Sequence, residues 1–231
     1  MAFFPMQIIE IYKSLQGESS YAGLPCIFVR LAGCNLRCSW CDSEYTFKGG
    51  SRMTLDEIEA QVRCLSPHGG LVEITGGEPM LQERDLIPLM ERLIQIGYRL
   101  LIETSGERPL ERVPKEVVKI VDVKCPDSGE GDSFRMSNLE QLTSRDEVKF
   151  VISSRRDYEF ARDFVREHAL DRKASPIFSP AFRKDAAGTR DAANCLVDPQ
   201  DLAQWMLADA VNARLGLQIH KFIWEPQVKG V

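Results

Sequence analysis

The sequence predicts an α/β protein built as a partial, reduced (β/α) barrel with mostly parallel strands. Two observations support this fold class. Short β-rich runs alternate with segments of helical periodicity along the chain, and these runs outnumber the clear helices. Strand–helix–strand units form parallel sheets whose crossovers are right-handed. Because there are too few helices to follow every strand, a complete barrel is not expected.

Eight short segments are predicted to be strands, because they combine apolar residues with β-branched or aromatic ones. They cover residues 6–11, 26–31, 71–75, 98–102, 117–123, 147–152, 175–178 and 216–219. Several of these segments are separated by a helical pattern, which places them in neighbouring positions of one sheet.

Four segments carry apolar residues at helical spacing. They cover residues 54–65, 83–96, 155–169 and 199–214. Thr54 and Glu57 have the spacing of a capping box at the start of the first helix. Asp198 followed by Pro199 is typical of the N-cap and first position of the last helix.

The polar stretches 125–138 and 183–195 are predicted to be long loops within one domain. Strand-forming segments resume after both stretches, so neither is expected to mark a domain boundary. The length of 231 residues is enough for one domain with a sizeable core. We therefore expect a single domain over residues 1–231.

Composition argues against a dedicated binder of nucleic acid or membrane. The formal net charge of -5 gives no overall attraction to polyanions. No stretch approaches the roughly 18 apolar residues of a membrane span, and the N-terminus lacks the pattern of a signal peptide. The seven cysteines are an odd number without a disulfide-like spacing, which favours a reducing cytoplasm.

Three cysteines in one loop are the first sign of chemistry. Cys34, Cys38 and Cys41 follow the predicted strand 26–31 with the spacing C-x3-C-x2-C. Thiolates are soft ligands that suit iron–sulfur clusters or zinc. A structural zinc ion takes four protein ligands, so three cysteines fit a 4Fe-4S cluster whose fourth iron binds a small molecule. Zinc with Cys125 or His220 as a distant fourth ligand stays an alternative.

A second motif, Thr-Gly-Gly-Glu-Pro at residues 75–79, ends the next predicted strand. Glycines allow backbone carbonyl groups to approach a ligand closely, where they accept hydrogen bonds from an amino group. The cysteine spacing, with aromatic Trp40 before the last cysteine, and this glycine motif together resemble the radical S-adenosylmethionine superfamily. The resemblance implies a barrel of the radical SAM type, a 4Fe-4S cluster and S-adenosylmethionine.

Further motifs extend the resemblance over nearly the whole chain. They are Ser-Leu-Gln-Gly-Glu at 14–18, Phe-Val-Arg-Leu at 28–31, Cys-Asp-Ser at 41–43, Asp-Val-Lys at 122–124, and Gln-Ile-His-Lys at 218–221 with Trp224. Together they are similar to the 7-carboxy-7-deazaguanine synthase family. Membership implies a carbon–nitrogen lyase of queuosine and 7-deazapurine biosynthesis. Its reaction converts 6-carboxy-5,6,7,8-tetrahydropterin to 7-carboxy-7-deazaguanine with loss of ammonia.

The resemblance also implies a role for individual residues. The cluster ligands would be Cys34, Cys38 and Cys41, and the Mg²⁺ ligand would be Ser43. The residues along S-adenosylmethionine would be Trp40, Cys41, Asp42, Gly77 and Lys124. The substrate contacts would be Leu15, Gln16, Gly17, Arg30 and Thr75. Two positions depart from the usual family pattern, which has Thr at position 43 and Gly at position 19, where this chain has Ser43 and Ser19.

The residues themselves support some of these roles and leave others open. Arg30, at a strand end, offers the planar pair of donors that a carboxylate prefers. The Ser43 hydroxyl is a hard oxygen ligand of the kind that Mg²⁺ accepts, although a turn residue fits equally well. Lys124 fits a site residue and a solvated lysine equally, and His220 fits a core histidine at least as well as a ligand.

The implied partners are a small-molecule pterin substrate, a reductase or flavodoxin-type electron donor, and a second copy of the chain in a homodimer. Two other functions share part of the pattern. An activase that places a glycyl radical on a partner protein would also carry the three cysteines and the glycine motif. A non-catalytic iron–sulfur or zinc module would carry the cysteines alone.

Overall fold

The computed structural model describes residues 4–184, 191–225 and 228–230, so residues 185–190 of the predicted loop 183–195 lie outside the described residues. One sheet of nine strands runs through the described part of the chain, in the order β3-β1-β2-β4-β5-β6-β7-β8-β9. Pairing is parallel from β2 to β9, and β1 pairs antiparallel with both β2 and β3. The sheet stays open, which confirms the predicted partial barrel with mostly parallel strands.

The strands fall close to the predicted segments. Their bounds are β1 Met6–Leu15, β2 Pro25–Leu31, β3 Ser51–Met53, β4 Leu71–Gly76, β5 Arg99–Thr104, β6 Val118–Asp122, β7 Glu147–Ile152, β8 Ser175–Pro180 and β9 Arg214–Leu215. The short edge strand β3 was not expected, because its three residues Ser-Arg-Met carry no strand pattern. It pairs with the start of β1 and extends the antiparallel edge.

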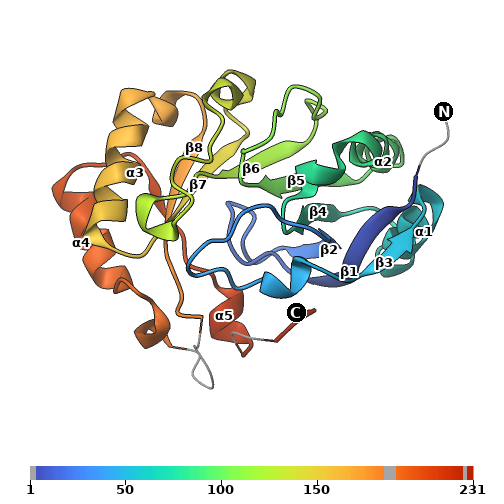
Figure 1. Ribbon diagram of the computed structural model, residues 1–231, viewed down its shortest axis with the longest axis horizontal. Helices are drawn as coiled ribbons and strands as arrows, with labels where there is room; N and C mark the ends of the chain where they lie inside the picture. Colours follow the sequence, from blue (N-terminus) through green and yellow to red (C-terminus); the bar gives the residue numbers. More distant parts are fainter. Residues whose placement is uncertain (1–3, 185–190, 226–227, 231) are drawn as a thin grey trace.

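Helices α1 to α4 lie on the outside of the curved sheet, with α1 and α2 near one end and α3 and α4 near the other (Figure 1). The bounds of the helices are α1 Leu55–Leu65, α2 Glu83–Gln95, α3 Arg155–Glu167, α4 Pro199–Ala208 and α5 His220–Ile223. Only 3-10 turns or loops join β5 to β6 and β6 to β7. The missing crossover helices explain why the barrel is reduced.

The N-terminal signals of two helices act as predicted. Thr54 accepts a hydrogen bond from the backbone of Glu57, and the Glu57 side chain accepts one from Thr54, which completes the capping box. The Asp198 carboxylate accepts a hydrogen bond from the backbone of Gln200, with Pro199 in the first turn. Each cap satisfies backbone N–H groups that have no partner inside the helix.

Two predictions near the C-terminus are wrong. The predicted helix 199–214 ends at Ala208, because Ala210 takes the left-handed conformation with φ 48°. The predicted strand 216–219 is shifted to Arg214–Leu215. Residues after Gly216 leave the sheet, and the backbone N–H of Ile219 donates to the carbonyl of Gly17 at 2.8 Å.

Strand alternation separates the core from the candidate site. On β4, Val72 and Ile74 are fully buried in the core that the outer helices cover. Glu73 and Thr75 point to the opposite face, because successive side chains of a strand alternate. Both are also buried, at 2% and 5% exposure, so the inner face of the sheet is shielded as well.

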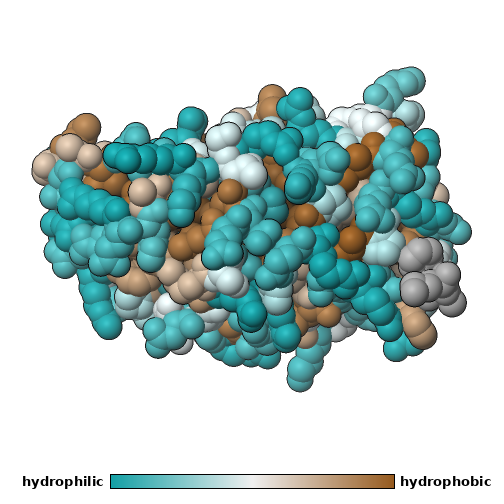
Figure 2. Space-filling model, turned by 90° about the horizontal axis from the view of Figure 1, so that it is seen from above, coloured by the Kyte–Doolittle hydropathy of each residue, from teal (hydrophilic) through white to brown (hydrophobic). Residues whose placement is uncertain are grey.

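The outer surface is largely hydrophilic, as Figure 2 shows for one face, with smaller hydrophobic areas between the charged side chains. Within the described residues, no helix combines the length and apolar character needed to cross a bilayer.

Candidate active site

A cavity of about 460 Å³ opens on the inner face of the sheet. Strands β2, β4, β5, β6 and β7 contribute side chains at their C-terminal ends, where parallel α/β folds place their chemistry. Every site residue predicted from the sequence lines this cavity. They are Leu15, Gln16, Gly17, Arg30, Cys34, Cys38, Trp40, Cys41, Asp42, Ser43, Thr75, Gly77 and Lys124. The fold therefore brings the predicted set together, and the role of each residue stays a prediction.

The cysteine loop, residues 32–43, leaves the end of β2 and rests on the loop 125–138. The backbone N–H of Ser39 donates to the carbonyl of Ser128 at 2.9 Å. The backbone N–H of Arg37 donates to the carboxylate of Glu130 at 2.6 Å. The long polar loop 125–138, whose role the sequence did not reveal, is therefore a support for the cysteines.

The three thiols fit a cluster better than a single ion. Among the described residues, no three His, Cys, Asp or Glu side chains are grouped closely enough to hold one metal ion. A 4Fe-4S cluster binds each thiolate at a different iron atom, so its ligands share a cavity without meeting at one point. Burial is the main cause that raises the pKa of Cys38 to about 11; Lys124 opposes it, and Asp122 and the thiols of Cys41 and Cys34 add to it.

The glycine motif is held against the cysteine loop by Glu78. This side chain is fully buried, and its carboxylate accepts hydrogen bonds from Thr104 Oγ1 at 2.7 Å and from the backbone N–H of Ser105 at 2.8 Å. The backbone N–H of Glu78 donates to the carbonyl of Gly33 at 2.8 Å. Glu78 thus joins the end of β5 to the cysteine loop, and its role is structural.

Gly77 has no room for a side chain. A Cβ atom at this position would lie 2.3 Å from the carbonyl oxygen of Gly33 and 2.7 Å from Cys34 Cβ. We expect Gly77→Ala to displace the cysteine loop, to lower the free energy of unfolding by about 1–3 kcal/mol and to reduce the iron bound per chain. Iron analysis after reconstitution and urea denaturation measure the two effects.

Gly97→Ala is the matched control for Gly77→Ala. Gly97 has φ +93°, and no atom lies within 4 Å of the position of its Cβ. This variant carries backbone strain without touching the site, so its iron content should equal that of the wild type. Equal iron content in Gly77→Ala would contradict the predicted contact.

Arg30 is held in place at the end of β2 by three neighbours. Its Nε donates to Glu10 Oε1 at 2.9 Å, and its Nη2 donates to Tyr12 Oη at 3.0 Å. Tyr45 also donates to Glu10 Oε1, at 2.9 Å. Because the residues around it fix one edge of the guanidinium, Arg30 is preorganised to bind an anion from the cavity.

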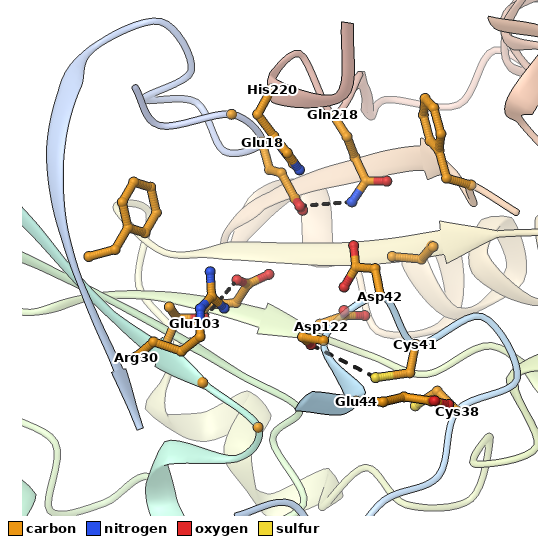
Figure 3. A pocket seen from close by; sticks show the side chains of 18 of the residues that line it. Glu18, Arg30, Cys38, Cys41, Asp42, Glu44, Glu103, Asp122, Gln218 and His220 are labelled. Atoms are coloured by element: carbon orange, nitrogen blue, oxygen red, sulfur yellow. Dashed lines mark hydrogen bonds between the residues drawn. The ribbon is translucent and has the colours of Figure 1, made fainter. Parts of the chain in front are cut away.

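The connection between β1 and β2 meets the C-terminal segment, residues 216–225, over the cavity. Gln218 Nε2 donates to Glu18 Oε1 at 2.8 Å. The ring of His220 packs directly on Gly17, where a Cβ would lie 2.2 Å from His220 Nδ1. Figure 3 shows Glu18, Gln218 and His220 on one side of the cavity, with Cys38 and Cys41 on the other.

Lys149 is the centre of a buried group of charges on the inner face. Its ammonium group donates to Glu18 Oε2 at 2.6 Å and to Glu103, and it lies 3.7 Å from Asp122 Oδ2. The Lys149 side chain is 4% exposed. Lys124 shares Asp122 with it, at 2.8 Å, so Lys124 is a paired cavity residue and is not a solvated lysine.

These contacts divide the carboxyl groups into two kinds. Burial alone would raise the pKa of Glu18, but the charge and hydrogen bond of Lys149, together with His220 and Lys221, outweigh it and hold this pKa at about 2. Burial and then repulsion by Glu103 raise the pKa of Glu73 to about 8. At neutral pH, Glu18 is therefore an anion and Glu73 is mostly a neutral acid.

The cysteine loop is also tied to the C-terminal segment. Lys221 donates to Asp42 Oδ2 at 2.5 Å. Ser43 Oγ lies 3.8 Å from Cys41 Sγ, and its hydroxyl makes no cap hydrogen bond to the 3-10 turn that follows. Ser43, whose hydroxyl is predicted to bind Mg²⁺, therefore lines the cavity beside Cys41.

The roles of Glu73, Lys149 and Lys221 in the site were missed by sequence reasoning. Glu73 and Lys149 lie in the middle of strands that are otherwise apolar, Leu-Val-Glu-Ile-Thr and Val-Lys-Phe-Val. Charged residues inside parallel strands are buried, and buried charges need partners. A charged residue in the middle of an apolar strand is therefore a sequence signal for a position on the inner face of the barrel.

Comparison with known proteins agrees with this site. Residues 29–124 match the family model described as the radical SAM superfamily. The 7-carboxy-7-deazaguanine synthase of Koribacter versatilis (strain Ellin345) is 72% identical over 98% of this chain and 100% of its own length. The chain belongs to the 7-carboxy-7-deazaguanine synthase family.

Other members of the synthase family agree in length and fold. The 7-carboxy-7-deazaguanine synthase of Chlorobaculum tepidum is 40% identical over 98% of this chain and 98% of its own length. The crystal structure of QueE from Escherichia coli superposes with a TM-score of 0.70 over 92% of this chain and 93% of that one, at 24% identity. Synthase membership excludes the glycyl-radical activase and the non-catalytic module, the two alternatives that the sequence left open.

Proposed function

We propose that this enzyme converts 6-carboxy-5,6,7,8-tetrahydropterin to 7-carboxy-7-deazaguanine with loss of ammonia. One observation carries the proposal: the cysteine loop, the glycine motif and Arg30 open onto the same cavity. A radical enzyme of this kind must place a cluster, S-adenosylmethionine and substrate side by side. Family membership supplies the identity of the reaction.

The proposed roles follow the walls of the cavity. Cys34, Cys38 and Cys41 would hold the 4Fe-4S cluster, and the backbone at Gly77 would accept hydrogen bonds from the amino group of S-adenosylmethionine. When bound, these groups supply the carbon radical that removes a hydrogen atom from the substrate. Arg30 would bind the substrate carboxylate.

The remaining predicted residues would complete these two binding sites. Trp40, Asp42 and Lys124 would lie along S-adenosylmethionine, with Asp42 oriented by Lys221. Leu15, Gln16, Gly17 and Thr75 would contact the pterin. The C-terminal segment covers this side of the cavity and would limit the access of water to the radical.

We assign Mg²⁺ to Ser43 and the substrate carboxylate. The hydroxyl of Ser43 lines the cavity, and Mg²⁺ takes few protein ligands when a substrate supplies the rest. Ser43→Ala should lose most of the magnesium dependence of product formation, whereas Ser43→Thr should retain it. Titration of Mg²⁺ against turnover measures both effects. If turnover in Ser43→Ala depends on Mg²⁺ as in the wild type, the assignment is wrong.

Three further features stay predictions. They are the reductase or flavodoxin-type electron donor, the homodimer and the cytoplasmic location. The free thiols of the described cysteines are compatible with a reducing compartment.

The proposed function is tested without oxygen. The protein is reconstituted with iron and sulfide and supplied with a reductant, S-adenosylmethionine, Mg²⁺ and 6-carboxytetrahydropterin. The expected result is 7-carboxy-7-deazaguanine in the mass spectrum, dependent on every component. Cleavage of S-adenosylmethionine without this product would mean that the superfamily is right and the substrate wrong.

A further inference from the structure

Phe28 and Glu73 lie two residues before Arg30 and Thr75 on β2 and β4, and with Tyr12 of β1 they form a partly apolar wall of the cavity. In the pairing of β2 with β4, Arg30 is opposite Thr75 and Phe28 is opposite Glu73. Two residues of strand span about 6.6 Å. A fused two-ring heterocycle whose carboxylate lies at Arg30 can therefore reach the level of Glu73.

The aromatic part of this wall suits a planar ring. Tyr12 and Phe28 are stacked, with ring centroids 5.1 Å apart and an interplanar angle of 14°. Both side chains line the cavity together with Glu73. A planar ligand packed on this wall would bring its polar edge to the carboxyl group of Glu73.

Gln16 fixes the hydrogen-bonding state of Glu73. The amide oxygen of Gln16 accepts hydrogen bonds from the backbone N–H groups of Glu18, at 2.6 Å, and Ser19, at 3.2 Å. Its Nε2 must therefore point the other way, and it donates to Glu73 Oε2. Within the described residues, no hydrogen bond reaches Oε1, the second oxygen of a carboxyl group that is 2% exposed.

The surroundings keep a proton on this carboxyl group. Burial and the negative charges of Glu103 on β5 and of Glu18 raise its pKa. Together they outweigh the hydrogen bond from Gln16 and the charge of Lys149 on β7, which lower it. The other titratable neighbours, Tyr12 on β1 and Cys26 on β2, are neutral at pH 7 because burial raises both of their pKa values. Since Oε2 accepts from Gln16, the proton belongs on Oε1.

We propose that Glu73 is a substrate-binding residue that acts as a neutral carboxylic acid. Its Oε1–H donates a hydrogen bond to the ring carbonyl oxygen of the pterin, and Gln16 positions it. The inference rests on the proposed function, because the ligand is the pterin substrate of that reaction. Glu73 would then recognise the ring of the pterin, whereas Arg30 binds only its carboxylate.

Direct binding tests the inference. The dissociation constant of 6-carboxytetrahydropterin is measured by anaerobic equilibrium dialysis from pH 6.5 to 9.5, on reconstituted protein with S-adenosylmethionine present. A donor with its pKa at about 8 is lost as the pH rises, so affinity should fall about tenfold between pH 7 and pH 9. Glu73→Gln keeps a donor of the same shape that does not titrate. Its affinity should stay near the wild-type value at pH 7 and lose this fall.

Two further variants isolate the hydrogen bond. Glu73→Leu removes the donor, so it should bind about tenfold more weakly than the wild type at pH 7 and about equally at pH 9, with kcat much less affected than KM. Glu147→Gln is the matched control, because Glu147 is equally buried and has its pKa raised by burial, but it does not line the cavity. It should retain the wild-type pH dependence.

Several results would overturn the inference. A tenfold loss of affinity in Glu73→Gln at pH 7 would mean that the anion, and not the acid, binds the ring. A pH dependence that persists in Glu73→Gln belongs to another group or to the pterin. Wild-type protein that binds the pterin as described but makes no product would refute the proposed function alone, whereas absence of binding would refute both.

Discussion

Cys38→Ala is expected to abolish the formation of 7-carboxy-7-deazaguanine. A 4Fe-4S cluster held by three cysteines has no protein ligand to spare, so loss of one thiolate leaves an iron atom unsupported. The variant protein should fold, because Cys38 lies on a loop that the backbone of residues 125–138 supports. Iron and sulfide analysis after reconstitution, the visible absorbance of the cluster and product formation are the three measurements.

Cys64→Ala is the control for this experiment. Cys64 is an exposed cysteine on α1, outside the cavity. Its removal should leave the iron content and the turnover unchanged. A Cys38→Ala protein that retains a complete cluster and full activity would contradict the assignment of this cysteine.

Lys149→Ala is expected to lower the free energy of unfolding by about 3–5 kcal/mol, because it leaves buried carboxylates without their cation. The ammonium group of Lys149 contacts Glu18 and Glu103 and lies near Asp122. Burial would lower the pKa of Lys149, but these carboxylates raise it well above its usual value. Urea denaturation at pH 7 measures the loss.

The pH dependence of this loss identifies its origin. The pKa of Glu18 is lowered from 4.5 to about 2, so its share of the stabilisation is present above pH 4.5 and is lost as the pH falls toward 2. The difference between Lys149→Ala and the wild type should therefore shrink in acid. Lys115→Ala, at an exposed position, should change stability by no more than about 0.5 kcal/mol. A Lys149→Ala protein as stable as this control would refute the charge network.

The elements that the sequence predicts best are those with strong local signals. The capping box at Thr54 and the Asp198–Pro199 pair both start helices as expected. The end of the last helix could not be predicted, because Ala210 takes a left-handed conformation without a glycine to indicate it. The strand expected at 216–219 failed because Ile219 is held by Gly17, a contact between residues far apart in sequence.

The residues of the candidate site also fall into those that local motifs predict and those that only the fold brings together. Cys34, Cys38 and Gly77 belong to short motifs, and the cavity unites them as expected. The partners of Lys149 come from three different elements, so no local pattern reveals which carboxylates it meets. Glu78 belongs to the predicted ligand-binding motif, but the fold shows that its carboxylate accepts hydrogen bonds from Thr104 and Ser105.

The C-terminal segment also has a consequence for the order of events on the ribosome. Residues 216–225 follow every strand of the sheet in chain order, and they connect Gly17 and Glu18 to the cysteine loop through Gln218 and Lys221. During synthesis the cysteines and the sheet therefore emerge before the segment that covers them. The three thiols are therefore less covered in the nascent chain than in the folded protein.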